Sequence, residues 1–288
     1  MRSLAARALP AAQGAPSPTQ TGRRVLFASA PAPAHDKPGH PECAARGAAV
    51  DAALAASGLV EAGRVHPASF DAVSLDDLAA AGVHDAGYVA GLAAECGRLG
   101  AAATVIESSP TYATATTFND AARAVGAAYA LVDAAFAAGD ASSPPPVGFA
   151  AVRPPGHHAG RATPQGFCLL NTAALAVRRA QTVHGAARVA VFDFDVHHGN
   201  GTNDIFHDDP SVLFVSTHQE FSFPGTGKLT DVGSGDGEGA TINLPLPADG
   251  GDGALRAAWE GVVAPALVRF APDFMVVSSG YDAHWSDM

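Results

Sequence analysis

Five short, almost continuous apolar runs, separated by alanine-rich stretches, constrain most strongly how this chain can fold. A strand buried on both faces shows such a run, whereas a strand with one solvent-facing side alternates apolar and polar residues. Because the intervening stretches are long enough for helices, the pattern predicts an α/β fold with a mainly parallel sheet covered by helices. The predicted strands are 25–28, 147–152, 189–192, 212–216 and 274–278, and the predicted helices are 41–56, 118–138, 171–183 and 254–270.

Histidines and carboxylates follow three of these runs, where each predicted strand ends. They are His157 and His158, then Asp195 and His197, then Asp282. In an open α/β sheet, ligands bind beyond the carboxyl ends of the strands, so we expect the three loops to meet at one site. If the segment after 189–192 is extended, Asp193, Asp195 and His197 face the same way. A carboxylate and an imidazole on one face can hold a divalent cation.

Asp195, His197 and Asp282 have the chemistry of a catalytic zinc site. Such a site typically has three nitrogen or oxygen ligands from the protein and leaves a position for water or substrate. Two carboxylates neutralise the charge of the dication, which then lowers the pKa of a bound water less than a site of neutral imidazoles would. A nearby base therefore becomes more important for activating that water. His157 and His158 are placed to be that base and its neighbour. Taken singly, an Asp-X-His after a strand is more often a solvated loop, and a His-His is more often a packing pair.

An acidic composition with few cysteines argues against several classes of protein. The chain has 17 Lys and Arg against 28 Asp and Glu, a formal charge of −11 and a pI near 5.4, so we expect no direct nucleic-acid binding. Its three cysteines show no CxxC spacing, which indicates neither a disulfide framework nor a cysteine zinc site. No apolar run approaches the roughly 20 residues that span a bilayer, so no membrane association is expected.

The first 23 residues differ in composition from the rest of the chain. They carry Arg2, Arg7 and Arg23 among Ala, Ser and Pro, and no acidic residue occurs before Asp36. We expect residues 1–23 to be a flexible leader and residues 24–288 to be the folded domain. The leader has the composition of an organellar transit peptide, which predicts a chloroplast or mitochondrial location. A disordered leader without a targeting role is the alternative, with a location in the cytoplasm or nucleus.

Longer segments around these residues resemble zinc-dependent histone deacetylases, and are similar to the class II group and to acetylpolyamine amidohydrolases. The resemblance runs from about residue 24 to the end, with the segments in the order of the family. The main segments are Arg153–Ala159, Gly166–Asn171, Asp193–Thr202, Phe223–Gly227 and Ser279–His284, with shorter matches at Gly39–Glu42, Thr111–Thr114 and Asn243–Pro247.

The resemblance implies an arginase/deacetylase-type three-layer α/β fold and one zinc ion held by Asp195, His197 and Asp282. The implied reaction is hydrolysis of an N-acetyl amide, with release of acetate. The substrate would be acetyl-lysine in proteins such as histones, or an acetylated polyamine or other small amine. A structural potassium ion is implied as well, near Asp193 and Asp195 and backbone oxygens around His197 and 216–218.

The resemblance also implies roles for the remaining site residues. His158 would be the general base and later the general acid. His157 would be its charged neighbour, held by Asp193, and Asn200 would orient His158. These roles agree with two physical requirements, because a base must lie within hydrogen-bond reach of the attacking water and a buried carboxylate favours an imidazolium beside it. The implied walls of the substrate tunnel are Gly166, Phe167 and Phe223.

Two departures from the family pattern alter these expectations. Where the family often has an aspartate that binds the substrate backbone, this chain has Ser109-Pro110 before Thr111, which favours a small N-acetyl substrate. Family members also continue beyond the third ligand to an Asp-Pro-Leu segment and a Gly-Gly-Tyr, whose hydroxyl polarises the substrate carbonyl. We therefore expect a domain without its C-terminal elements that binds metal but turns over slowly, since losing one oxyanion donor costs about 10²–10³ in rate.

Two other interpretations stay open at this stage. A ureohydrolase of the arginase fold would use two manganese ions and a second aspartate close after the Asp-X-His, where this chain has Gly199. The other alternative is a non-catalytic truncated fragment that acts as a binding or dominant-negative protein, or a truncated gene model.

Overall fold

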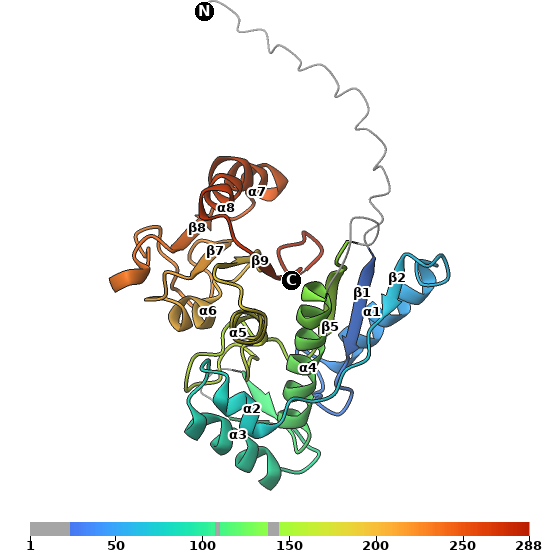
Figure 1. The fold of residues 1–288 in the computed structure, drawn as a ribbon. Helices are drawn as coiled ribbons and strands as arrows, with labels where there is room; N and C mark the ends of the chain where they lie inside the picture. Colours follow the sequence, from blue (N-terminus) through green and yellow to red (C-terminus); the bar gives the residue numbers. More distant parts are fainter. Residues whose placement is uncertain (1–23, 107–109, 138–143, 288) are drawn as a thin grey trace, which may run out of the picture.

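The computed structural model describes residues 24–106, 110–137 and 144–287 (Figure 1). The predicted leader, residues 1–23, lies outside them, and so does Ser109. All five predicted strands are present. The strands of the described residues are β1 (Val25–Ala30), β2 (Val65–Pro67), β3 (Thr104–Val105), β4 (Tyr112–Ala113), β5 (Val147–Val152), β6 (Val189–Asp193), β7 (Val212–Gln219), β8 (Thr241–Leu246) and β9 (Phe274–Ser278).

The parallel strands lie in two sheets. One has the order β2-β1-β5 and the other the order β8-β7-β6-β9, while β3 and β4 form a separate antiparallel pair. Within the four-stranded sheet, Asp193 at the end of β6 is in register with Ser216 of β7 and Ser278 of β9. Strands β7 and β9 therefore extend as far as the carboxyl end of β6, where the segment with Asp195 and His197 begins.

The four predicted helices are present and differ at their ends, and the described residues form three further helices that were not predicted. The helices are α1 (Ala44–Ala56), α2 (Leu75–Ala80), α3 (Ala86–Arg98), α4 (Thr117–Phe136), α5 (Thr172–His184), α6 (Asn200–Ile205), α7 (Gly251–Ala258) and α8 (Ala264–Phe270). Those that were not predicted are α2, α3 and α6. The predicted helix 254–270 is divided, because a π-helical turn, Trp259–Val263, separates α7 from α8. The predicted helix 171–183 begins one residue later, because the Asn171 side chain accepts the Ala174 N–H as an N-cap.

Helices cover both faces of the four-stranded sheet (Figure 1). Val191 of β6 and Phe214 of β7 belong to the cluster that includes Leu175 of α5. Their neighbours Phe192 and Val215 point the other way and pack in a cluster with residues of α8 and the π-helical turn. This alternation explains why the strands are apolar throughout. The predicted three-layer α/β fold is confirmed.

In the described part of the chain, no helix is both long enough and apolar enough to cross a membrane.

Candidate active site

The chain bends directly after β6 instead of continuing as an extended segment. Asp193 is the last residue of the strand, and residues 195–197 form a bend. The Asp193 Oδ1 atom accepts the N–H of Asp195 at 3.2 Å, and Asp195 Oδ1 accepts the N–H of His197 at 2.8 Å. Aspartate side chains that bind the backbone two residues later favour a turn over a strand. The expectation of an extended Asp193–His197 segment is therefore wrong, although the side chains still gather at one edge.

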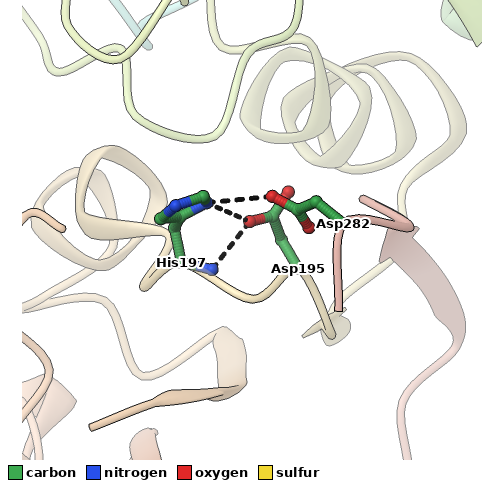
Figure 2. A group of neighbouring side chains, drawn as sticks. All are labelled: Asp195, His197 and Asp282. Atoms are coloured by element: carbon green, nitrogen blue, oxygen red, sulfur yellow. Dashed lines mark hydrogen bonds and ion pairs between the residues drawn. The ribbon is translucent and has the colours of Figure 1, made fainter. Parts of the chain in front are cut away.

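Asp195, His197 and Asp282 converge, as Figure 2 shows, and their potential ligand atoms lie within 4.8 Å of one another. The Nδ1 atom of His197 is 3.1 Å from Asp195 Oδ1 and 3.0 Å from Asp282 Oδ2. Pairing of β9 with β6 brings the two segments together, and the N–H of Val196 donates to Asp282 Oδ1 at 3.1 Å. Gly280 permits this approach, because a Cβ there would lie 1.8 Å from Asp195 Oδ2.

The donor atoms of this triad suit zinc. Hydrogen bonds from the His197 ring to the carboxylates of Asp195 and Asp282 raise the pKa of His197 to about 10, so the site favours positive charge. Two oxygen donors and one nitrogen donor form a ligand set typical of catalytic zinc. The His197 side chain is 34% exposed, so the triad is open on one side. The three residues therefore fit a zinc ion with a position left for water or substrate.

His157 lies behind the triad as one half of a buried ion pair. Its Nδ1 is 2.9 Å from Asp193 Oδ2, and its Nε2 is 3.8 Å from Asp195 Oδ2. Burial by itself lowers the pKa of His157, but the charges of Asp193 and Asp195 outweigh burial and raise it to about 9. His157 is therefore an imidazolium at neutral pH.

His158, in contrast to His157, is uncharged. Its Nδ1 lies 2.7 Å from Asn200 Oδ1, an acceptor, so the ring proton is on Nδ1 and Nε2 keeps a free lone pair. The rings of His157 and His158 are 3.9 Å apart, centroid to centroid. Burial, and then the positive charge of His157, hold the pKa of His158 well below its ordinary value. Two neighbouring groups with pKa values driven apart are a hallmark of acid–base sites.

Two of the three predicted tunnel residues, Gly166 and Phe223, pack against His158. The ring of Phe223 stands edge-on to His158, with centroids 5.1 Å apart, and 6.1 Å from His197. A Cβ on Gly166 would lie 2.3 Å from His158 Cδ2 and 3.0 Å from Phe223 Cε1, so Gly166 packs directly against both. The ring of Phe167 instead packs edge-on to the ring of His40, with centroids 4.6 Å apart. The tunnel between Phe167 and Phe223 stays a prediction.

His198, the second histidine of the pair after β6, has a structural environment. It is buried, and its Nδ1 lies 2.8 Å from the hydroxyl of Thr226. Burial lowers the pKa of His198 to about 3, so the ring is neutral. This agrees with a packing role.

A buried charged network behind the His157–His158 loop was not singled out from the sequence. Arg153, at the start of that loop, pairs with Glu42 through Nε and through Nη2, the latter at 2.9 Å. Its Nη1 donates to the carbonyls of Pro31 and Ala32 at 2.8 and 3.0 Å. Tyr112 donates to Glu42 Oε2 at 3.0 Å. A signal was available, because Glu42 is the one carboxylate of the segment Gly39–Glu42 and Arg153 is the one arginine or lysine of the segment Arg153–Ala159.

Comparison with known proteins agrees with these observations. The family model described as "Histone deacetylase domain" matches residues 40–288. Histone deacetylase 14, chloroplastic, of Arabidopsis thaliana is 47% identical over 270 residues, which cover 92% of this chain and 63% of that protein. Histone deacetylase 10, chloroplastic, of Oryza sativa subsp. japonica is 47% identical over 269 residues, covering 91% of this chain and 60% of the relative. The chain thus spans less than two thirds of the length of either relative.

The solved structures give the same result. The crystal structure of the HDA15 HD domain superposes with a TM-score of 0.83 at 35% sequence identity, and the match covers 92% of this chain and 75% of that one. The fold, the order of the sequence segments and the family model agree, and the chain belongs to the histone deacetylase domain family.

Proposed function

We propose that this chain carries the metal ligands and the proton-transfer groups of a zinc-dependent hydrolase of N-acetyl amides. The observation that supports this proposal best is the arrangement at the end of β6. A zinc-type ligand triad lies beside two histidines, of which His157 is charged and His158 is neutral. Membership of the histone deacetylase domain family supports the same reaction.

When bound by Asp195, His197 and Asp282, zinc would supply Lewis-acid polarisation of the acetyl carbonyl and of the attacking water. His158 accepts the proton of that water at Nε2, because its Nδ1 proton is committed to Asn200. The same Nε2 then donates the proton to the leaving amine nitrogen. His157 stays charged through Asp193, and its charge helps to keep His158 neutral before attack.

The proposed substrates are acetyl-lysine in a protein or a small N-acetyl amine. Gly166 and Phe223 present an apolar surface next to His158, which suits the methylene stem of either substrate. A structural potassium ion near Asp193 and 216–218 stays a prediction from the family resemblance. The domain limits of 24–288 are likewise a proposal, supported by the start of β1 at Val25 and by the family match over 40–288.

The four tyrosines all lie in the described ranges, and none of the hydrogen bonds or ring contacts that they make there reaches the triad. Tyr88 donates to the Leu169 carbonyl, and Tyr112 to Glu42. Tyr129 lies under the guanidinium of Arg179, and the ring of Tyr281 packs on Phe194. We therefore propose that residues 1–288, assayed by themselves, lack the hydroxyl that polarises the substrate carbonyl and turn over slowly.

A direct test uses purified 1–288 and a chimera that appends the part of Arabidopsis Histone deacetylase 14 beyond the matched region. Both proteins should bind one zinc ion per chain, and the chimera should hydrolyse an acetyl-lysine reporter about 10²–10³-fold faster, the usual effect of one oxyanion donor. Elemental analysis and acetate release measure the two quantities. Two manganese ions per chain would favour the ureohydrolase alternative. One zinc ion with no turnover in either protein would favour the non-catalytic fragment.

We also propose that the protein acts in the chloroplast. The support is the printed location of the two relatives, together with the arginine-rich, acid-free composition of residues 1–23. Residues 1–30 fused to a fluorescent protein should follow chlorophyll fluorescence in leaf cells. The same fusion with Arg2, Arg7 and Arg23 changed to glutamate should stay in the cytosol. Diffuse signal from the unchanged fusion would contradict the proposal, and mitochondrial signal would redirect it.

A further inference from the structure

A buried histidine just before α3, His84, lies between two of the segments that surround His158. Its side chain belongs to a residue that is 3% exposed. The Nδ1 atom of His84 is 2.8 Å from the carbonyl oxygen of Gly160, two residues after His158. The backbone N–H of Asn171 donates to the Nε2 atom of His84 at 2.9 Å. One ring therefore joins the loop that carries His158 to the segment Gly166–Asn171.

Two backbone groups fix the protonation state of the His84 ring. The Gly160 carbonyl oxygen can only accept a hydrogen bond, so Nδ1 must carry a proton. The Asn171 N–H can only donate, so Nε2 must offer its lone pair. The neutral Nδ1–H form is therefore the form of the ring that satisfies both neighbours. Burial acts in the same direction, because it lowers the pKa of His84 from its ordinary value.

Asn171 returns to the same loop through its side chain. Its Oδ1 atom accepts the N–H of Ala174, and this backbone donor sets the orientation of the amide. The Nδ2 atom then donates to the carbonyl oxygen of Ala159 at 3.2 Å. Both residues that follow the proposed base are thus tied to Asn171, Ala159 through the Asn171 amide and Gly160 through the His84 ring.

The two joined segments also meet on either side of the proposed base. A Cβ on Gly156 would lie 2.8 Å from the carbonyl oxygen of Leu170, so the loop lies against the second segment without space between them. Gly166, at the other end of that segment, packs against the His158 ring. A shift of one segment along the other would therefore move His158 relative to the reacting atoms. A misplacement of about 1 Å can cost up to about 100-fold in rate.

We propose that His84 is a positioning residue, whose neutral ring keeps the loop that carries His158 in register with the segment Gly166–Asn171. The inference rests on the proposed function for its catalytic consequence, but the two hydrogen bonds and the tautomer do not depend on turnover. The proposed metal ligands follow β6 and β9, on other segments, so zinc binding should not depend on His84.

Exchange of the ring tests this role in whichever form of the protein turns over, residues 1–288 or the chimera. His84→Phe keeps a ring and loses both hydrogen bonds, and we expect kcat per bound zinc to fall about tenfold with zinc content unchanged. His184→Phe on α5 is the matched control, because it also exchanges rings and removes a hydrogen bond, to Asp133. It should leave kcat unchanged. Equal kcat per bound zinc in His84→Phe and the parent protein would overturn the proposal.

Two amide variants separate the hydrogen bonds from ring packing, and they decide the question if His84→Phe does not fold. His84→Asn offers an amide nitrogen near the place of Nδ1, which can donate to Gly160. His84→Gln offers an amide oxygen near the place of Nε2, which can accept from Asn171. Each keeps one hydrogen bond and should lose about threefold in kcat. Parent-like kcat in both, or a tenfold loss in both, would contradict the proposal.

The hydrogen bonds can also be measured without turnover. Nitrogen-15 NMR, assigned with His84→Phe, should show the neutral Nδ1–H form of His84 at pH 7. The Asn171 amide proton should exchange with solvent about fivefold faster in His84→Phe, as for loss of one hydrogen bond. If both results appear but no form hydrolyses an acetyl amide, the proposed function fails and the positioning of the loop stands. The Nε2–H tautomer, or unchanged exchange, would refute the positioning role even in an active enzyme.

Discussion

Replacing Arg153 with methionine should lower the free energy of unfolding by about 3–5 kcal/mol, the usual cost of removing one partner of a buried ion pair. Glu42 would keep its charge with no guanidinium beside it, and the carbonyls of Pro31, Ala32 and His35 would lose the hydrogen bonds that the guanidinium donates. Chemical denaturation monitored by circular dichroism measures the loss. Because Arg153 begins the loop that carries His157 and His158, the loss should come with reduced zinc-dependent activity.

Two controls distinguish this from a general effect of losing arginine. Arg179→Met breaks a half-exposed pair with Asp133 and should cost less than about 1 kcal/mol. Combining Arg153→Met with Glu42→Leu should recover much of the loss, because no unpaired charge then stays buried. Equal destabilisation by Arg153→Met and Arg179→Met would contradict the assignment.

The Arg153 effect should also depend on pH. Burial tends to raise the pKa of Glu42, but the neighbouring His35, with Nε2 3.5 Å from Oε2, and the hydrogen bonds from Arg153 overcome this and lower it from 4.5 to about 2. A carboxyl whose pKa is lowered by folding stabilises the fold above its unfolded pKa. The difference between parent and Arg153→Met should therefore be full at pH 7 and should shrink as the pH falls from 4.5 towards 2.

Changing His158 and His197 should separate chemistry from metal binding. We expect His158→Gln to lower kcat by about 10²–10⁴-fold, the usual contribution of a general base, with zinc content unchanged. His197→Ala should lower zinc affinity by more than about 100-fold, which exceeds the cost of losing a group outside the ligand set. Competition against a fluorescent zinc chelator gives the affinity, and acetate release gives kcat.

A histidine away from the site provides the control. His66→Gln on β2, in the other sheet, should change neither quantity. If His158→Gln loses zinc as readily as His197→Ala, His158 is a ligand, and the division of roles is wrong. If His197→Ala keeps full zinc affinity, the metal binds elsewhere.

The buried strands and the ligand motif could be predicted from the sequence because each depends on local pattern. The strands at 189–192 and 212–216 are apolar on both faces and buried, and the structure shows helices on both sides of β6. Strand β8 was missed because it alternates in burial and contains Pro245. Helix α3 was missed because three glycines weaken its helical pattern.

The details of the site could not be predicted, because they depend on contacts between segments far apart in the chain. The bend after Asp193 competes with continuation of the strand, and side-chain hydrogen bonds decide the outcome. Glu42 and Arg153 are 111 residues apart, so only folding shows that they pair. Gln165 and Asn200 are 35 residues apart, so their side-chain contact likewise appears only in the folded chain.

Asp282 and Val196 are 86 residues apart in the chain, yet one hydrogen bond joins them. The segment between them contains β7, β8, α7 and α8, so this hydrogen bond joins the two ends of a long stretch of chain. Closing such a loop restricts the unfolded chain, and a cation held by Asp195, His197 and Asp282 would clamp the same two ends. The ligand triad thus also links the segments that follow β6 and β9. A cation bound there would stabilise the folded state of the four-stranded sheet by mass action.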